Sequence, residues 1–433
     1  MNDMSRRVLP PASTGPEEPS RPRNMRTAPF GVLDIGTTKI ACLIGRTESD
    51  GTLRVLGFGW QKGRGVRGGG IVDLEEAERA IRACVGQAED MADTRLRAVT
   101  VNLTCGQPES RLFNVQWPVG GRAVEEADVR RVVHEGRARA LVEGRDTIHA
   151  LPLTFTVDDM QGVADPRGLH CATLTARLHV IDAATTALRS LGACIARSDL
   201  DISELVSAPM AAGLSTLVHD ERELGVTVID MGGGTTGMAV FAEGQLLHTS
   251  QLPVGGVHVT NDLARLLSTP VAHAERLKTL YGNAQTCADD DREMLPVPLV
   301  GEEEHQIAKV PRSMIVNIIR PRLEETFELV KERIDGSGLS RAAGTRVVLT
   351  GGASLLGGAG EMAARILGRQ VRIGRPHGLR GLPDSASGPA FSTAAGLLAW
   401  TAGEGRTMHD LDLEAAQPTG LFRRFVNFLK ERV

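Results

Sequence analysis

The chain has 433 residues, which is enough for two to four domains of ordinary size. Its 49 lysines and arginines against 53 aspartates and glutamates give a formal net charge of −4, which disfavours a protein that coats nucleic acid. The hydrophobic content of 42% and charged content of 24% exclude global disorder. Six scattered cysteines form no CxxC pair, so the sequence predicts no zinc site or disulfide framework and favours a reduced, cytoplasmic compartment.

The predicted elements alternate between strands and helices. Residues 1–28 are rich in proline and arginine without a periodic apolar pattern, so we expect a disordered N-terminal tail. Two strands joined by a tight turn follow, and then a helix that Asp73 is placed to cap. The segment 98–180 combines β-branched stretches with one helical stretch, which predicts an inserted α+β subdomain. A helical pattern at 182–217 and predicted strands at 225–252 follow. This alternation of strands and helices predicts an α/β fold with largely parallel sheets.

One internal repeat organises the chain. The strand-turn-strand segment VLDIGTT, which contains Asp34, reappears as VIDMGGGTT, which contains Asp230. The two copies lie too far apart for a solenoid and indicate duplication of a whole domain.

The repeated turns suit the binding of a polyphosphate. Glycine lets the backbone approach an anion so that several N–H groups converge on it, and the neighbouring threonines add hydroxyl donors. An aspartate at the end of each first strand suits Mg²⁺ held through water. The alternative is a pair of tight hairpins that bind nothing, and two matched copies disfavour it. A third glycine turn follows the predicted strand 347–350, where open α/β sheets bind ligands.

Other nucleotide and catalytic motifs are missing or misplaced. The segment GRGVRG at 63–68 has the spacing GxGxxG, but no helix starts from it, so we interpret it as a loop. The sequence contains no P-loop motif GxxxxGK[ST], no GxSxG and no HExxH.

Together these motifs resemble the actin-like ATPase superfamily. VLDIGTTKI is similar to its first phosphate motif, VIDMGGGTTGMAVF to its second and VVLTGGASLLGGAGEMA to its adenosine motif. Within the superfamily, GGGIVDLEEAERAI, NDLARLLSTPVAHAERLKTLYG and VPRSMIVNIIRPRLEETFELV resemble the FtsA family of bacterial cell division proteins. The resemblance covers roughly residues 30–433. It implies a duplicated actin-like fold, as in actin, hexokinase and the heat-shock chaperone ATPases, with an α+β insertion and a C-terminal amphipathic helix.

The resemblance also implies how the chain divides. The expected parts are the tail 1–28; subdomain 1A at 29–97, 181–224 and 376–402; the inserted subdomain 1C at 98–180; subdomain 2A at 225–256 and 346–375; subdomain 2B at 257–345; a linker at 403–419; and the helix at 420–433. Subdomain 2B would lie above the nucleotide and is the candidate binding site for the C-terminal tail of FtsZ.

Carried over residue by residue, the resemblance implies a site for ATP and Mg²⁺. The phosphate-binding residues would be Asp34, Gly36, Thr37, Thr38, Lys39, Asp230, Gly232, Gly233, Gly234 and Thr235. The adenosine-binding residues would be Gly351, Gly352 and Ala353, with Asn261, Glu275 and Lys278. Asp34 and Asp230 would also hold Mg²⁺ through water.

Two departures from the superfamily predict slow ATP hydrolysis, and no residue is assigned a catalytic role. Gly237 stands where members often carry a second aspartate, and Ala208 where they often place a glutamine or glutamate that orients the attacking water. Loss of such a group typically slows a reaction ~10²–10⁴-fold.

Residues 420–433 predict an amphipathic helix that lies on a membrane. Its expected lipid contacts, apolar on one face and basic on the other, are Leu421, Phe422, Phe425, Val426, Phe428, Leu429, Arg423, Arg424 and Lys430. The segment is too short to span a bilayer but fits an interfacial helix on anionic phospholipid. Docking on the protein's own core is the alternative. A filament would strengthen weak anchors by avidity, ~10²–10⁴-fold.

The resemblance therefore implies a scaffold that binds ATP, assembles into filaments with itself and hydrolyses ATP slowly at most. It would tie the FtsZ ring to the cytoplasmic side of the inner membrane at the division septum and recruit later cell-division proteins, with no nucleic acid as partner. Two alternatives stay open: an actin-like scaffold of another envelope assembly, such as a pilus platform, and a small-molecule kinase of the same superfamily.

Overall fold

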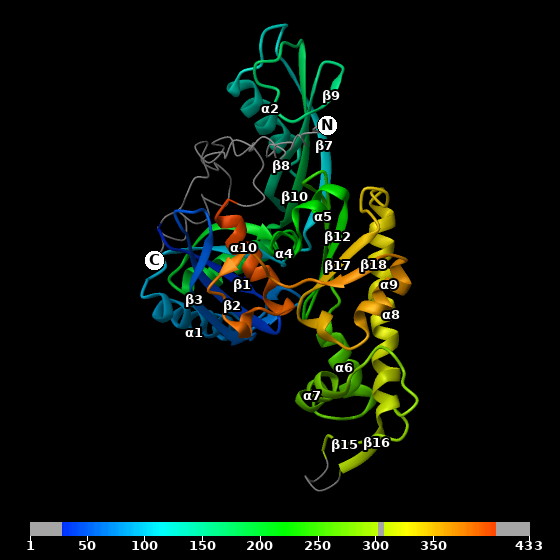
Figure 1. The fold of residues 1–433 in the computed structure, drawn as a ribbon. Coiled ribbons are helices and arrows are strands. Elements are labelled where there is room, and N and C mark those ends of the chain that lie inside the picture. Colours follow the sequence, from blue (N-terminus) through cyan, green and yellow to red (C-terminus); the bar gives the residue numbers. More distant parts are fainter. Residues whose placement is uncertain (1–27, 302–306, 404–433) are drawn as a thin grey trace, which may run out of the picture.

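The computed structural model describes residues 28–301 and 307–403. Figure 1 shows two sheet-centred bodies side by side, with a smaller α+β unit at one end of the molecule and a mainly helical unit at the other. The predicted tail at 1–28 and the predicted helix at 420–433 therefore lie, but for residue 28, outside the described residues. Within those residues, no helix combines the length and the apolar character needed to cross a membrane.

The first sheet has six strands in the order β11-β6-β1-β2-β3-β19. Its strands are β1 (Phe30–Ile35), β2 (Lys39–Thr47), β3 (Leu53–Lys62), β6 (Ala98–Leu103), β11 (Asp201–Ser207) and β19 (Leu379–Arg380). Strand β1 is antiparallel to β2 across the tight turn and parallel to β6 on its other side.

The second sheet repeats this arrangement with five strands in the order β14-β13-β12-β17-β18. Its strands are β12 (Val226–Met231), β13 (Thr236–Ala242), β14 (Gln245–Leu252), β17 (Arg346–Thr350) and β18 (Gln370–Ile373). Strand β12 is antiparallel to β13 across the second turn and parallel to β17. Both sheets are therefore mixed, and the expectation of largely parallel sheets is wrong. The reason is local: a turn of a few residues can join only antiparallel neighbours.

Two buried helices pack against each other between the sheets, α4 (Ala208–Thr216) and α10 (Ser392–Thr401). Helix α10 contacts β1 and β2, while α4 contacts β12 and β13. A Cβ at Gly396 would lie 1.6 Å from the carbonyl oxygen of Ala211, so the two helix backbones approach as closely as only glycine allows.

Further helices cover the sheets and form the helical end of the molecule. They are α1 (Leu74–Ala92), α3 (Thr185–Arg197), α5 (His219–Leu224), α6 (Gly256–Leu266), α7 (Val271–Tyr281), α8 (Arg312–Gly336) and α9 (Ala359–Leu367), with 3₁₀ turns at Gly352–Leu355, Asp384–Ala386 and Pro389–Phe391. The two-stranded ribbon of β15 (Met294–Pro298) and β16 (Ile307–Pro311) lies at that end (Figure 1). The Asp73 side chain accepts hydrogen bonds of 3.0 Å from the backbone N–H groups of Glu75 and Glu76, which confirms the predicted cap of α1.

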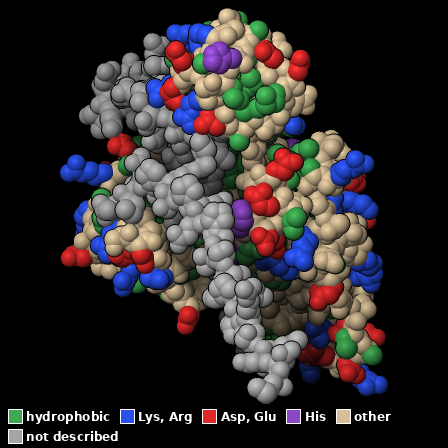
Figure 2. All heavy atoms as spheres, turned by 45° about the horizontal axis from the view of Figure 1, so that its top comes forward, with side chains coloured by type: hydrophobic (Ala, Val, Ile, Leu, Met, Phe, Trp, Pro, Cys, Tyr) green, Lys and Arg blue, Asp and Glu red, His purple; other side chains and the backbone are tan. Residues whose placement is uncertain are grey.

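The inserted α+β unit has an antiparallel sheet of its own in the order β7-β10-β8-β9. Its elements are β7 (Glu109–Pro118), α2 (Glu126–Arg139), β8 (Arg145–Val157), β9 (Met160–Val163) and β10 (Thr173–Ala184). Helix α2 packs on this sheet over a separate apolar core that includes Phe155 and Leu178. Figure 2 shows acidic and basic side chains interspersed over one face of the molecule, with hydrophobic side chains between them.

The segment at 63–68 does not start a helix, as predicted, but it is more than a loop. Part of it forms β4 (Val66–Arg67), which pairs with β5 (Gly70–Ile71) in a short hairpin. A Cβ at Gly63 would lie 2.5 Å from the carbonyl oxygen of Thr37, so this hairpin packs directly against the first glycine turn.

Candidate functional site

A cavity of about 380 Å³ lies between the two glycine turns, within the size range of ligand pockets. It is lined by residues of both turns, of the connection after β17 and of helices α7 and α8. All of the predicted phosphate-binding residues line it, and so do Gly351, Gly352, Ala353, Glu275 and Lys278. Asn261 does not: it lies on α6 with an exposed side chain.

The two turns have the same internal geometry. The backbone N–H of Gly36 donates to the carbonyl oxygen of Lys39 at 2.9 Å, and the N–H of Gly232 donates to that of Thr235 at the same distance. A Cβ would lie 2.9 Å from that oxygen in the first turn and 3.0 Å in the second, which leaves little space for a side chain in either. The repeat seen in the sequence is thus a repeat of backbone conformation.

The turns also face each other at close range. A Cβ at Gly233 would lie 2.5 Å from Cγ2 of Thr38, and one at Gly234 would lie 2.3 Å from Oγ1 of Thr37. The absence of side chains at these two glycines lets the threonines of the first turn contact the backbone of the second. Hydroxyl and backbone donors from both turns therefore line the same end of the cavity.

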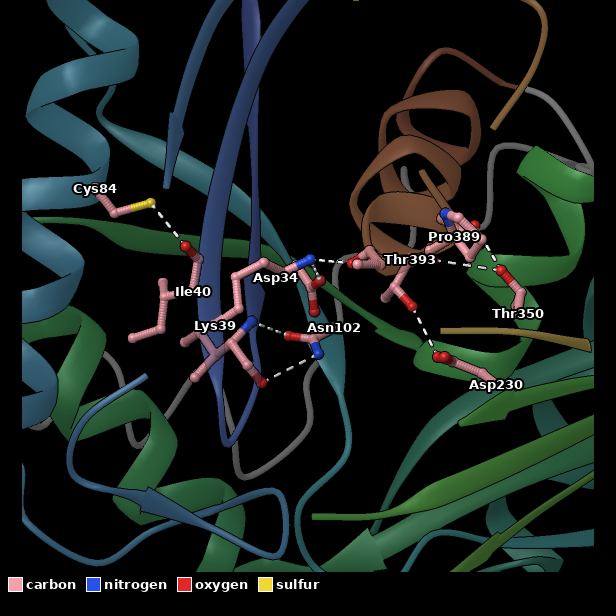
Figure 3. A network of polar contacts seen from close by, with 12 residues as sticks. Asp34, Lys39, Ile40, Cys84, Asn102, Asp230, Thr350, Pro389 and Thr393 are labelled. Atoms are coloured by element: carbon pink, nitrogen blue, oxygen red, sulfur yellow. Dashed lines mark hydrogen bonds and ion pairs between the residues drawn. The ribbon is translucent and has the colours of Figure 1, made fainter. Parts of the chain in front are cut away.

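Three ionisable side chains gather at this end, from β1, β2 and β12 (Figure 3). Nζ of Lys39 lies 3.9 Å from Oδ2 of Asp34, donates to the carbonyl oxygen of Ala390 and sits 3.7 Å from the ring centroid of Phe391. Oγ1 of Thr393 on α10 donates to Oδ2 of Asp230 at 2.9 Å.

Burial governs the protonation of this group. It raises the pKa of Asp34, which the Lys39 ammonium partly offsets, and it lowers the pKa of Lys39. Burial also raises the pKa of Asp230 to about 6, against the hydrogen bond from Thr393, which lowers it. Two carboxylates and one ammonium leave an excess of buried negative charge when all three are ionised. A divalent cation fits such a site because it would neutralise that charge.

Asn102 fixes the end of the first strand beside this group. Its Oδ1 accepts from the backbone N–H of Ile35 at 2.7 Å, and its Nδ2 donates to the carbonyl oxygen of the same residue at 3.3 Å (Figure 3). This pairing continues from the parallel ladder between β1 and β6 and holds the start of the glycine turn in place.

The other end of the cavity carries a hydrogen-bonded group on α6 and α7. Nζ of Lys278 donates to Oε2 of Glu275 at 2.7 Å, to Oγ1 of Thr260 at 2.9 Å and to the carbonyl oxygen of Gly256 at 3.1 Å.

Gly351, in the turn after β17, lies next to Asp230. It has φ of +85°, and a Cβ there would lie 2.4 Å from Oδ1 of Asp230, so both conformation and space require glycine.

Several cavity residues escaped the sequence analysis, among them Gly69, Asn102, Thr104 and Gln251. Gly69 is the middle residue of the GGG run at 68–70, which begins at the last residue of the segment 63–68, and its backbone nitrogen lies 3.5 Å from Oγ1 of Thr37. The glycine run was the available signal for it. The other three lie on strands or strand ends, and no local motif marks them.

The comparison with known proteins begins with the curated relatives. This chain is 43% identical over 407 residues to the cell division protein FtsA of Agrobacterium fabrum strain C58, covering 92% of this chain and 90% of that protein. The chain belongs to the FtsA family of cell division proteins. It is also 34% identical to FtsA of Pseudomonas aeruginosa, covering 84% and 87% of the two chains, and 33% identical to FtsA of Escherichia coli K12, covering 84% and 88%.

Two family models agree with this assignment. The model of cell division protein FtsA matches residues 227–396, and the model of the SHS2 domain inserted in FtsA matches residues 105–182. The second match lies on the α+β unit of β7 to β10, which is therefore an SHS2 domain.

Solved structures confirm the actin-like fold. The chain superimposes on the PilM–PilN type IV pilus biogenesis complex with a TM-score of 0.62 at 17% identity, covering 88% of this chain and 99% of that one. It superimposes on MreB5 of Spiroplasma citri bound to ADP with a TM-score of 0.52 at 14% identity, covering 86% and 95%. At these identities the likeness is one of fold alone.

Proposed function

We propose that this FtsA-family protein is an ATP-binding scaffold of cell division whose filaments hold the FtsZ ring at the membrane. The observation that carries the ATP site is the pair of equivalent glycine turns, which face each other across a cavity containing two buried carboxylates and one lysine. Backbone donors from two sides suit a chain of phosphates better than a single anion.

At the phosphate end, the turn residues would bind the polyphosphate and Asp34 and Asp230 would hold Mg²⁺ through water. Burial raises the pKa of both carboxyl groups, so their ionised forms are unfavourable unless a cation lies beside them, and Mg²⁺ would be that cation. Lys39 would contact phosphate oxygens from the same side. Mg²⁺ would supply neutralisation of the charge on the phosphates.

At the adenosine end, Gly351, Gly352 and Ala353 would line the nucleoside, and Glu275 and Lys278 would meet its polar groups. Their place in the lining of the same cavity supports this part of the site. The exposed Asn261 on α6 has no such support.

Hydrolysis would be slow. Ala208 and Gly237 both line the cavity, and neither has a side chain that can orient water. The scaffold would therefore hold ATP for long periods, and filament assembly rather than turnover would be its purpose.

The remaining parts would connect the scaffold to its partners. Subdomain 2B, at 257–345, would bind the C-terminal tail of FtsZ, and exposed apolar side chains on its helices, such as Leu266, Val271 and Leu280, support a surface for an apolar peptide. Residues 420–433 would bind anionic phospholipid as an in-plane helix. Polymerisation would multiply these weak anchors, and later division proteins would join the assembled filament. The subdomain boundaries expected from the sequence form part of the same proposal.

The experiment is flotation with liposomes of anionic phosphatidylglycerol in the presence of ATP and Mg²⁺. The full chain is compared with a chain that ends at Pro418, and FtsZ is added in a second series. The proposal expects that only the full chain floats and that FtsZ floats with it. If the full chain floats but the added FtsZ does not float with it, the result favours a scaffold of another envelope assembly. In a separate assay, transfer of phosphate from ATP to small hydroxyl compounds would favour a kinase. Equal flotation of both chains would overturn the membrane anchor.

A further inference from the structure

The SHS2 domain is inserted in one half of the molecule and lies against the other. The halves are the two bodies built on the first and on the second sheet. The chain enters the domain from β6 and leaves it into α3, and both of these elements belong to the first half. Strands β7, β8 and β10 of the domain nevertheless contact β14, which is an edge strand of the second sheet. The domain therefore joins the two halves in addition to the packing of α4 on α10.

Hydrogen bonds connect β14 to the SHS2 domain. Nε2 of Gln245 donates to the carbonyl oxygen of Leu153 on β8 at 2.7 Å. The backbone N–H of Thr249 donates to Oγ of Ser110 on β7 at 3.2 Å, and the same Oγ lies 3.3 Å from Nδ1 of His248. We call the contact made by these five residues the seam. Because β14 ends its sheet among the described strands, the SHS2 domain supplies the acceptor that an edge N–H otherwise lacks.

The second glycine turn and the seam belong to one sheet. The turn runs directly into β13 at Thr236, which lies opposite Leu252 in the antiparallel pairing of β13 with β14. At this end of β14, Nε2 of Gln251 donates to the carbonyl oxygen of Thr104, which follows β6 in the first half, at 2.8 Å. A displacement of the second turn away from the first half therefore also moves β14 against the SHS2 domain.

The structure has the two halves in close contact at the cavity and at the seam together. The glycine turns meet at the cavity, since a Cβ at Gly233 would lie 2.5 Å from Cγ2 of Thr38. The hydrogen bonds of the seam are formed in this same closed arrangement. A ligand held between the two turns is released more readily when they separate, and their separation would strain or break the seam.

We propose that the seam is a brace, through which the SHS2 domain holds the two halves in the closed arrangement and slows the release of a bound nucleotide. The proposal rests on the ATP binding proposed above. A contact that is formed in one arrangement only shifts the population toward that arrangement. Since linked equilibria are reciprocal, a nucleotide that favours the closed arrangement must in turn strengthen the seam.

The first test measures nucleotide release. The full chain is loaded with a fluorescent, non-hydrolysable ATP analogue and Mg²⁺, below the concentration at which it assembles into filaments, and dissociation is followed after addition of excess unlabelled analogue. Gln245→Met and Gln245→Glu remove the bond to Leu153 at a residue that does not line the cavity. Gln116→Met is the matched control, because Gln116 is an exposed glutamine on β7 of the SHS2 domain.

We expect both Gln245 variants to release the analogue about 3–10-fold faster than wild type, which is the effect of losing one hydrogen bond of ordinary strength. The Gln116 variant should release it at the wild-type rate. Thermal melts identify any variant that fails to fold, and the second measurement, which needs no variant, then decides.

The second test follows hydrogen exchange at the amide of Thr249 in wild type, with and without the analogue. This amide reports on the seam directly, because its hydrogen is donated to Ser110 across it. Thr249 does not line the cavity, so direct contact with the nucleotide does not account for protection. We expect the bound analogue to slow exchange at least about 3-fold, because opening of the seam then becomes rarer.

Two results would overturn the brace while ATP binding stands. One is release at the wild-type rate from folded Gln245 variants, and the other is exchange at Thr249 that the analogue leaves unchanged. Failure of wild type to bind the analogue would remove the ATP site itself, and the role of the seam with it.

Discussion

A hydrogen bond of 2.9 Å from Oγ1 of Thr393 to Oδ2 of Asp230 links the two halves of the molecule at the cavity. Thr393 belongs to α10, which packs on the first sheet, whereas Asp230 ends the first strand of the repeated hairpin in the second sheet. The bond holds the Asp230 carboxylate at the boundary of the cavity and links its position to the relative placement of the two sheets. A ligand that contacts Asp230 can therefore influence how the two halves sit against each other.

Replacing Thr393 with valine should weaken the binding of ATP with Mg²⁺ about 10-fold, since a hydrogen bond to a charged group contributes roughly 1.5–3 kcal/mol. The measurement is a calorimetric titration. Thr401→Val is the matched control, because Thr401 lies on the same helix and donates to Oγ1 of Thr100 at 3.0 Å, away from the cavity. Equal affinities in the two variants would contradict the role of Thr393.

Gly234→Ala should disrupt the contact between the two turns. The new Cβ would lie 2.3 Å from Oγ1 of Thr37 and 3.0 Å from the backbone nitrogen of Gly68, and the backbone cannot move aside as a flexible side chain can. Overpacking of this kind typically costs about 1–3 kcal/mol, so both the melting temperature and the ATP affinity should fall.

Gly86→Ala on α1 is the control for that substitution, because no atom lies within 4 Å of the Cβ that it adds. Alanine in a helix is favoured over glycine by about 1 kcal/mol, so this variant should be as stable as wild type or more so. A Gly234→Ala protein with unchanged stability and affinity would refute the close packing of the turns.

Stability should fall in mild acid because of the histidines between the SHS2 domain and the second sheet. Nε2 of His179 lies 2.6 Å from Oγ of Ser110, which is also 3.3 Å from Nδ1 of His248 on β14. Burial lowers the pKa of His179 to about 3 and also lowers the pKa of His248. The unfolded chain takes up a proton on each below about pH 6.5, while the folded protein keeps His179 neutral down to about pH 3.

The free energy of unfolding should therefore decrease as the pH falls below 6.5, by about 1.4 kcal/mol per pH unit for each histidine that stays neutral in the folded protein. Urea titrations at a series of pH values between 7.5 and 4.5 measure this slope. His179→Asn should flatten it, and the exposed His134→Gln controls for loss of a histidine from the surface. The same slope in the His179 variant and in wild type would contradict the assignment.

Asp182 should be critical for the stability of the SHS2 domain. This buried carboxylate at the end of β10 accepts hydrogen bonds from Arg145 and Arg111. Asp182→Asn leaves two arginines without their carboxylate and should lower the free energy of unfolding by about 3–5 kcal/mol.

The exposed pair of Arg139 and Glu135 on α2 provides the contrast for Asp182. Glu135→Gln should cost no more than about 0.5 kcal/mol, as is usual for such pairs on a helix surface. Urea unfolding measures both variants. Similar decreases in the free energy of unfolding would show that the buried Asp182 cluster stabilises the protein no more than an exposed ion pair does.

The sequence predicted the parts of this structure that depend on local patterns. The repeated Asp, Gly and Thr residues specify two turns, and each turn needs only neighbours in the chain to form. The cap at Asp73 and the insertion of an α+β unit were predictable for the same reason. Which strands pair across long stretches of chain was not predictable. The mixed character of both sheets was missed for another reason: each tight turn makes its own two strands antiparallel, and the alternation of strands and helices does not show this.

The same contrast holds for the site: residues in a local motif were predicted, and residues that long-range strand pairing brings to the cavity were not. The glycines and aspartates of the turns lie where the motifs put them, whereas Gln251 reaches the cavity only because β14 pairs with β13 and because Thr104, far away in sequence, receives its amide. Asn261 is the converse case: the resemblance implied that it contacts the adenosine, but it is exposed and does not line the cavity. The predicted membrane helix at 420–433 lies outside the described residues and stays a prediction.

The measurement that tests the account most directly is the affinity of the full chain for ATP with and without Mg²⁺, in wild type and in Asp34→Asn. We expect wild type to bind ATP in the presence of Mg²⁺ and to lose at least about 10-fold in affinity without it, because the buried carboxylates then meet the phosphates without a cation between them. The Asp34 variant should depend on Mg²⁺ less strongly than wild type. No binding of ATP, or binding that is indifferent to Mg²⁺ in both proteins, would contradict a nucleotide site between the two glycine turns.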